Sequence, residues 1–394
     1  MTKNTSVILQ PEYVEHFQCD GTKCNAKCCK NWRITIDINT YRKYQRIKNH
    51  SIRNKILSSM EPDGIKAGCV QIKLNSEGAC PLICSDSLCY IQRNLGADAL
   101  SNICSLYPRI VRHIGDCQLR TLSMTCPVAA EAALFSEHGM DIKNLLPGNE
   151  DALWKFALKS KNCKIDADTN LAANVILGSL SILQNTYYTF EQRMVVLGLF
   201  LDKADELQAL PNSAEAIFET ALFYNGDEFA TQVQEIFANW TFYPTAHGQL
   251  LEGILASLQD KTKISNIFLL IRQVHDYTKN YPDFHSLTQN TFGTAIDKYW
   301  QQEFICRGFP FCMEGSFLHN YFAYIIAYKI WEMCLYHYCC KSEGQISRNE
   351  FLNLVTRYSE NLNHLGNFIH YLVQYTAPFE KEPIKLMQVL LRLK

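Results

Sequence analysis

The sequence lacks the features of an exported or membrane-bound protein. Its first residues, MTKNTSVILQPEYVEHF, do not contain the apolar core of roughly 7–15 residues that a signal peptide needs. The most apolar later stretch, NYFAYIIAYKIWEMCLYHYCC, is interrupted by Lys329 and Glu332. A membrane-spanning helix needs about 18 or more consecutive apolar residues, and no such run occurs. These absences predict a soluble, cytoplasmic chain without a membrane partner.

The chain also lacks an excess of either charge. It has 38 lysine and arginine residues against 39 aspartate and glutamate residues, a net charge of −1 and a pI near 6.8. Nucleic-acid-binding domains usually carry a clear basic excess, so no nucleic-acid partner is expected. Hydrophobic residues make up 47% and charged residues 20% of the 394 residues, which indicates an ordinary globular protein long enough for two domains.

Several fingerprints of known catalytic sites are missing as well. The sequence has no GxGxxG after a strand, no Walker loop, no HExxH and no G-x-S-x-G. Its histidines are scattered rather than clustered. The residue pattern therefore identifies neither catalytic nor cofactor-binding residues, and it gives no oligomeric state.

Cysteine is what the sequence has in abundance. Eleven of the 17 cysteines lie in the first 126 residues, and four of them fall within FQCDGTKCNAKCCKNW, residues 17–32. A reducing compartment keeps thiols free of disulfides, and clustered cysteines there more often hold a metal. The pattern favours metal binding. Inert reduced thiols and a disulfide framework are the alternatives.

The cysteine spacing narrows the kind of metal site. It runs as Cys19-x4-Cys24-x3-Cys28-Cys29, then Cys80-x3-Cys84-x4-Cys89, then Cys104 and Cys126. A zinc ribbon would need C-x2-C pairs and a ferredoxin a C-x2-C-x2-C run, and neither occurs in this region. The C-x3-C-x2-C triad of radical S-adenosylmethionine enzymes is also absent. The site must be assembled from several segments, and thiolate ligands leave zinc, copper(I) and iron–sulfur clusters open.

The front part of the chain shows the pattern of short strands. Ile34, Ile36 and Ile38 alternate with polar residues, as do Val70, Ile72 and Leu74, which is typical of half-buried strands. RIVRHIGDCQLRTLSM predicts a hairpin that turns at Gly115-Asp116. Pro127 suits the first position of a helix, so Cys126 is expected at a helix N-terminus, where the macrodipole favours a thiolate.

The period changes to that of helices beyond about residue 150. Thr189 with Gln192 and Ser347 with Glu350 form the capping pattern of helix starts. An apolar stripe predicts a further helix; it consists of Leu250, Leu251, Ile254, Leu255 and Leu258. The predicted fold class is mainly α, with a cysteine-rich metal-binding region of short strands over residues 12–136 and an all-α domain over 150–394.

Three other features have competing interpretations. His113 could be a cluster neighbour or ligand, but a strand histidine that faces solvent is the preferred interpretation. Arg109 could bind a carboxylate or phosphate, or form an ordinary ion pair at the edge of a hairpin. An aromatic run is expected to pack in a core rather than form a ligand cage; it comprises Tyr321, Phe322, Tyr324, Tyr328 and Trp331.

The segments CNAKCC, CPLICSDSLCYIQRNLGADALSNICSLYPR and RTLSMTCPVAAEAAL closely resemble the flagellin lysine-N-methylase family of bacteria (FliB). The front half also resembles the CxxCxxCC family of zinc- or iron-chelating domains, although Cys19-x4-Cys24 is wider than that family's spacing. The cysteines that match the flagellin methylase pattern are Cys19, Cys24, Cys28, Cys29, Cys80, Cys89, Cys104 and Cys126. Cys69, Cys84 and Cys117 do not match it.

The resemblance implies an S-adenosylmethionine-dependent methyltransferase that modifies lysine side chains of flagellin and carries a [4Fe-4S] cluster, with zinc as the alternative metal. The matching cysteines are then the metal ligands, and the helical domain is expected to recognise the substrate. The competing hypothesis is a non-enzymatic metal-chelating module whose helical part binds a partner. Which four cysteines hold one cluster, and whether methyl transfer is polar or radical, stay open.

Overall fold

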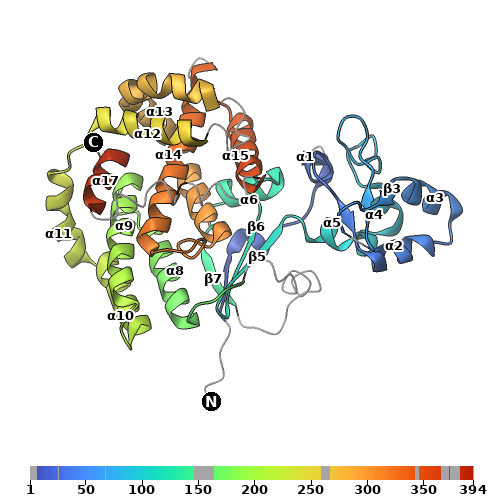
Figure 1. Ribbon diagram of the computed structural model, residues 1–394, viewed down its shortest axis with the longest axis horizontal. Coiled ribbons are helices and arrows are strands. Elements are labelled where there is room, and N and C mark those ends of the chain that lie inside the picture. Colours follow the sequence, from blue (N-terminus) through green and yellow to red (C-terminus); the bar gives the residue numbers. More distant parts are fainter. Residues whose placement is uncertain are drawn as a thin grey trace.

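The structure, a computed structural model, describes residues 7–24, 26–66, 68–145, 164–258, 267–341, 346–364, 372 and 382–393. The predicted start of the helical domain at residue 150 lies outside these ranges. Figure 1 shows a large, mostly helical body and a smaller lobe beside it, and the lobe is formed by the blue and teal part of the chain. The mainly α class with short strands near the N-terminus is confirmed. In the ranges given, no helix is long and apolar enough to cross a membrane.

A five-stranded sheet lies in the large body, in the order β7-β1-β6-β5-β8. Its strands are β1 (Ile8–Pro11), β5 (Arg109–Ile114), β6 (Cys117–Leu122), β7 (Ile142–Leu145) and β8 (Lys164–Ile165). Strands β5 and β6 form the predicted hairpin, and Gly115 turns it with φ +58°. A Cβ at Gly115 would meet the carbonyl oxygen of Ala167, so this turn requires glycine.

The small lobe is inserted between β1 and β5. Its elements are α1 (Gly21–Cys24), η2 (Lys27–Cys29), β2 (Thr35–Ile36), α2 (Ile38–Gln45), α3 (His50–Ser58), β3 (Met60–Pro62), β4 (Val70–Ile72), α4 (Tyr90–Leu95), η3 (Ala97–Ala99) and α5 (Asn102–Leu106). Strands β2, β4 and β3 form a second sheet in that order. The strand predicted through Ile38 ends earlier, because the Asp37 side chain accepts a hydrogen bond from the amide of Thr40 at 2.9 Å and caps α2.

The rest of the large body is helical. Its helices are α6 (Pro127–Phe135), α8 (Thr169–Gln184), α9 (Phe190–Leu207), α10 (Ser213–Asn225), α11 (Asp227–Ala238), α12 (Pro244–Leu258), α13 (Ile267–Arg307), α14 (Phe317–Lys341), α15 (Arg348–His364) and α17 (Pro383–Leu390). The predicted capping box of Thr189 and Gln192 starts α9, and that of Ser347 and Glu350 starts α15. Pro127 stands at the first position of α6, as expected.

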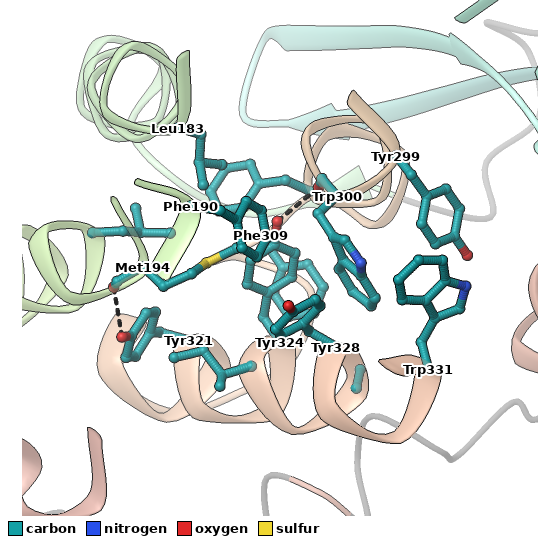
Figure 2. Packing of buried hydrophobic residues seen from close by; sticks show 14 of the residues in the cluster. Leu183, Phe190, Met194, Tyr299, Trp300, Phe309, Tyr321, Tyr324, Tyr328 and Trp331 are labelled. Carbon is teal, nitrogen blue, oxygen red and sulfur yellow. Dashed lines mark hydrogen bonds between the residues drawn. The ribbon is translucent and has the colours of Figure 1, made fainter. Parts of the chain in front are cut away.

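The aromatic side chains of α13 and α14 form the centre of the large core. Figure 2 shows Trp300, Tyr324 and Tyr328 packed against one another and against residues of α8 and α9. Two of the tyrosine hydroxyls satisfy backbone carbonyls: Tyr321 donates to Met194 at 2.6 Å, and Tyr324 donates to Trp300 at 2.7 Å. These rings fill a core, so the predicted packing role of the aromatic run is confirmed.

Each lobe has its own core. The smaller core consists of Ile34, Ile36, Tyr44, Ile56, Ile72, Cys80, Leu82 and Ile91. The larger core includes residues of β1, β6 and α6 together with the helices. Within the large body, Tyr13 links the sheet to the helices: its hydroxyl donates to Gln302 of α13 at 2.8 Å and accepts from the amide of Leu122 in β6 at 3.1 Å. The predicted division into cluster binding (12–136) and substrate recognition (150–394) stays a functional prediction.

His247 makes stability depend on pH. It is buried in α12, and its Nδ1 donates to the carbonyl of Val389 at 2.7 Å. Burial, followed by the nearby charge of Lys329, lowers the pKa of His247 to about 3, while Glu332 acts in the opposite direction. Because the unfolded chain binds a proton more readily than the folded one, His247 stabilises the fold fully above about pH 6.5 and progressively less as the pH falls.

We therefore expect His247→Leu to reduce the pH dependence of stability. Between pH 7.5 and pH 5.0 the native chain should lose about 2 kcal/mol of unfolding free energy that the variant does not lose, a figure obtained from about 1.4 kcal/mol per pH unit below 6.5. Urea unfolding followed by circular dichroism at the two pH values measures this difference. Equal losses for both proteins would contradict the role assigned to His247.

Candidate functional site

A cavity of about 610 Å³ lies between the small lobe and the N-terminus of α6. All eight cysteines that match the methylase pattern line it: Cys19, Cys24, Cys28, Cys29, Cys80, Cys89, Cys104 and Cys126. Cys69, Cys84 and Cys117 do not line it. The fold therefore separates the two sets of cysteines in the same way as the sequence comparison does.

Both lobes contribute to this arrangement. Cys80 belongs to the small core, and Cys29, Cys89 and Cys104 pack against it. The amide of Cys80 donates to the carbonyl of Cys29 at 2.8 Å, which holds the paired-cysteine segment beside the following turn. Cys126 belongs to the large core and stands at the N-cap of α6. Residues of both cores thus line the cavity.

The adjacent cysteines are positioned as a pair. Ala26 enters η2 in the left-handed region with φ 53°, and the indole nitrogen of Trp32 donates to the Cys28 carbonyl at 2.7 Å. The sulfurs of Cys28 and Cys29 lie 3.8 Å apart. The hydrogen bond between them lowers the pKa of Cys28, and the same contact together with burial raises the pKa of Cys29. Cys28 is therefore the more readily ionised thiol of the pair.

Burial raises the pKa of five other thiols of the cavity: Cys19, Cys80, Cys89, Cys104 and Cys126. It raises the pKa of Cys80 to about 11 and the pKa values of Cys104 and Cys126 to about 12. The amides of Val128 and Ala129 at the start of α6 do lower the pKa of Cys126, as the helix dipole predicts, but burial outweighs them. The start of α6 thus favours the Cys126 thiolate, as predicted, but burial keeps the free thiol protonated. A bound cation would have to displace these protons.

The thiols are suited to a metal by their chemistry. Soft sulfur donors select zinc, copper(I) and iron–sulfur clusters, and the cavity gathers eight of them. Within the residues that the structure describes, no group of three or more potential ligands is close enough to hold a single metal ion. The fit of these cysteines to a metal or cluster therefore rests on their soft sulfur donors and on their gathering in one cavity.

The remaining walls combine apolar and aromatic side chains with polar and charged ones, among them Asp20, Lys27 and Lys43. The apolar and aromatic lining consists of Phe17, Trp32, Ile34, Ile36, Tyr44, Ile72, Leu82, Ile91 and Tyr107. Arg109 also lines the cavity; its Nη1 donates to the Ser105 carbonyl at 3.4 Å, and its guanidinium carbon lies 5.8 Å from the Phe17 ring centre. Such walls can hold a ligand that has a planar ring and an anionic group.

The two residues of β5 that the sequence singled out differ in position. Arg109 lies on the cavity wall, which favours the ligand-binding alternative. His113 does not line the cavity and is half-buried, with its Nε2 shielded from solvent, so the solvent-facing interpretation is wrong. The aromatic lining was missed by the sequence analysis. The closeness of Phe17 and Trp32 to the first four cysteines is the signal that could have indicated it.

Comparison with known proteins gives three findings. A sequence model described as the FliB lysine N-methylase C-terminal domain matches residues 178–387. A flagellar biosynthetic protein FliU of Salmonella muenchen is 40% identical over 140 residues, which cover 34% of this chain and 80% of that protein. Lysine-N-methylases of Salmonella choleraesuis and Salmonella typhimurium are each 38% identical over 138 residues, or 34% of this chain and 34% of each relative.

These matches differ in how much of each protein they cover. The matched segment spans about a third of the length of the two lysine-N-methylases, whereas it covers most of the FliU protein. No solved structure matches this chain. The family model alone matches more than half of the chain, from α8 to α17.

Proposed function

The chain belongs to the FliB lysine N-methylase family, and from this premise we propose that it is an S-adenosylmethionine-dependent methyltransferase that acts on lysines of flagellin and carries a [4Fe-4S] cluster. The observation that supports the proposal most strongly is the cavity itself. It brings together eight cysteines that are spread over more than a hundred residues of sequence and leaves out three of their neighbours.

The cluster would be held by cysteines of the small lobe, among them Cys80, Cys89 and Cys104. These three lie in or against the small core, so the small lobe alone positions them. When bound, such a cluster can hold the amino-acid end of S-adenosylmethionine on an open iron or take part in redox chemistry. It would also stabilise a lobe whose own core is small.

The same cavity offers places for S-adenosylmethionine. Trp32 and Tyr107 provide flat apolar faces for an adenine ring, and Arg109 provides a planar cation for the carboxylate. The Tyr107 hydroxyl lies 2.9 Å from Thr125 Oγ1, and burial raises the pKa of Tyr107, so the phenol stays neutral at pH 7. These are the residues to which we assign the methyl donor.

Methyl transfer to lysine requires a neutral amine. A free lysine side chain has a pKa of about 10.4 and is almost fully protonated at pH 7. The apolar wall beside Ile34, Ile72 and Leu82 would lower that pKa by removing water from the amine. The nitrogen lone pair would then attack the methyl carbon, the carbon–sulfur bond would break, S-adenosylhomocysteine would leave, and the resulting secondary ammonium would release a proton to solvent.

The experiment that tests the proposal is mass measurement of flagellin expressed with and without this protein. We expect increments of about 14 Da, the mass of one CH₂, on surface lysines, because each transfer replaces N–H by N–CH₃. The purified protein with S-adenosylmethionine, prepared without oxygen, should give the same increments. A stable complex with flagellin whose mass does not change would favour the non-enzymatic partner-binding module instead.

A further inference from the structure

A second groove, of about 510 Å³, runs beside the cysteine cavity. It lies between the paired-cysteine segment of the small lobe and helices α6 and α15, which come close to α1 in Figure 1. Most of the residues that line it have a charged or amide side chain; the lining comprises Lys23, Cys24, Lys27, Lys30, Pro127, Val128, Glu131, Asn349, Leu352, Asn353 and Arg357.

The charge of this groove is strongly positive. Four of the residues that line the groove are basic (Lys23, Lys27, Lys30 and Arg357) and one is acidic, Glu131, which itself pairs with Arg348 at 2.9 Å. Lys27 lies 3.2 Å from Glu360 and Lys23 lies 3.7 Å from Asp20. Lys30 and Arg357 form no ion pair with any residue that the structure describes. This concentration of cations contrasts with the net charge of −1 for the whole chain.

The groove and the cavity share a wall. Cys24, Lys27, Pro127 and Val128 line both of them. A chain segment that lies in the groove therefore reaches the edge of the space where the cysteines gather. In α15, Asn349 and Asn353 stand four residues apart on the groove side and offer amide groups to an extended backbone.

Resting on the proposed methylase function, we propose that this groove binds acidic side chains that flank the reacting lysine of the protein substrate. The lysine itself is a cation and gains no attraction from four basic side chains. An aspartate or glutamate next to that lysine is attracted to the groove, because its carboxylate can form charge-assisted hydrogen bonds with Lys30 and Arg357. The same positive field lowers the pKa of the entering amine, since like charges disfavour its protonated form.

The test uses two peptides that differ only in charge beside one lysine. One carries glutamates on both sides of the lysine and the other carries glutamines. We expect the native protein to bind and methylate the glutamate peptide roughly five- to tenfold better, which is the value of about two exposed charge pairs. Added salt should reduce this preference because the charges are exposed. Fluorescence anisotropy measures binding, and mass spectrometry measures kcat/KM.

Reversing the charge of both residues, Lys30→Glu with Arg357→Glu, should abolish or invert the preference for the glutamate peptide over the glutamine peptide. The matched control is Lys48→Glu with Lys66→Glu, which changes the net charge equally at exposed positions of the small lobe that line neither space. If the reversal variant does not fold, Lys30→Gln with Arg357→Gln should still lose the preference. A control that loses it as much as the reversal would mean that only overall charge acts, and would overturn the proposal.

The outcomes separate this proposal from the proposed function. Equal methylation and equal binding of both peptides by the native protein would overturn the groove proposal and leave the methylase intact. Methylation of neither peptide, with a binding preference that disappears on reversal, would support the groove and count against the methylase. A short duplex DNA that binds through Lys30 and Arg357 more tightly than the glutamate peptide would also overturn the assignment of an acidic protein segment.

Discussion

Cys104→Ala is expected to remove the cluster and at least about 90% of methylation activity. Cys104 lies in α5, packs against the small core and lines the cavity, where it is partly buried. Loss of a residue that merely orients a metal ligand already costs about 10- to 100-fold in affinity or activity, so loss of a ligand should cost at least as much. Native protein purified without oxygen should be brown and contain iron and acid-labile sulfide. The Cys104→Ala variant purified in the same way should lack all three, as chemical analysis of iron and sulfide and the absorption spectrum would show.

Cys84→Ala is the matched control for this change. Cys84 lies in the turn between Cys80 and Cys89 and does not line the cavity. Its backbone amide donates a hydrogen bond to the Leu88 carbonyl at 2.8 Å. The variant should keep iron, colour and activity close to those of the native protein. Native protein that holds stoichiometric zinc without iron or sulfide would contradict the cluster assignment, as would a Cys104→Ala variant with undiminished iron.

Gly198→Ala is expected to destabilise the large body by about 2–5 kcal/mol, the combined cost of overpacking and of a broken buried hydrogen bond. A Cβ on Gly198 would lie 2.6 Å from the Tyr321 ring and would also meet Met387. Tyr321 would have to move, and its 2.6 Å hydrogen bond to Met194, drawn in Figure 2, would break. The urea midpoint of unfolding should fall accordingly.

Gly248→Ala provides the opposite case in another helix. The nearest atoms to a Cβ at Gly248, in Val274 and Thr278, are 3.7 and 3.8 Å away, which is ordinary contact. Alanine should therefore stabilise α12 by about 0.5–1 kcal/mol through its higher helix propensity. If both substitutions shifted the urea midpoint in the same direction, close packing around Gly198 would not be the cause.

Local features of the fold could be predicted from the sequence because local interactions determine them. The helix starts at Thr189 and Ser347 depend on residues three positions apart, and the turn at Gly115 was indicated by the adjacent Gly115-Asp116 pair. The strand predicted through Ile38 was wrong for a local reason as well: the Asp37 side chain caps a helix that begins at Ile38, although the alternating pattern favours a strand. The five-stranded sheet was missed because β1 pairs with β6, about 110 residues later.

The candidate site was predictable in part. The eight cysteines could be named from a resemblance, and their gathering in one cavity agrees with it. Their partners could not be named, because the walls come from segments that only the packing of the two cores brings together. Arg357 lies more than three hundred residues after Lys30, and no periodicity or spacing connects them.

The insertion of the small lobe within the large sheet also sets the order in which the chain can assemble during synthesis. Strand β1 is made first, but its neighbours β6 and β7 leave the ribosome only after the whole lobe. The last residue of α6 follows Cys104 by 31 positions (135 − 104), which take about 2–6 s at 5–20 residues per second. For those seconds the lobe can fold while its cysteines still face solvent, so a cofactor can enter from the side that α6 later closes.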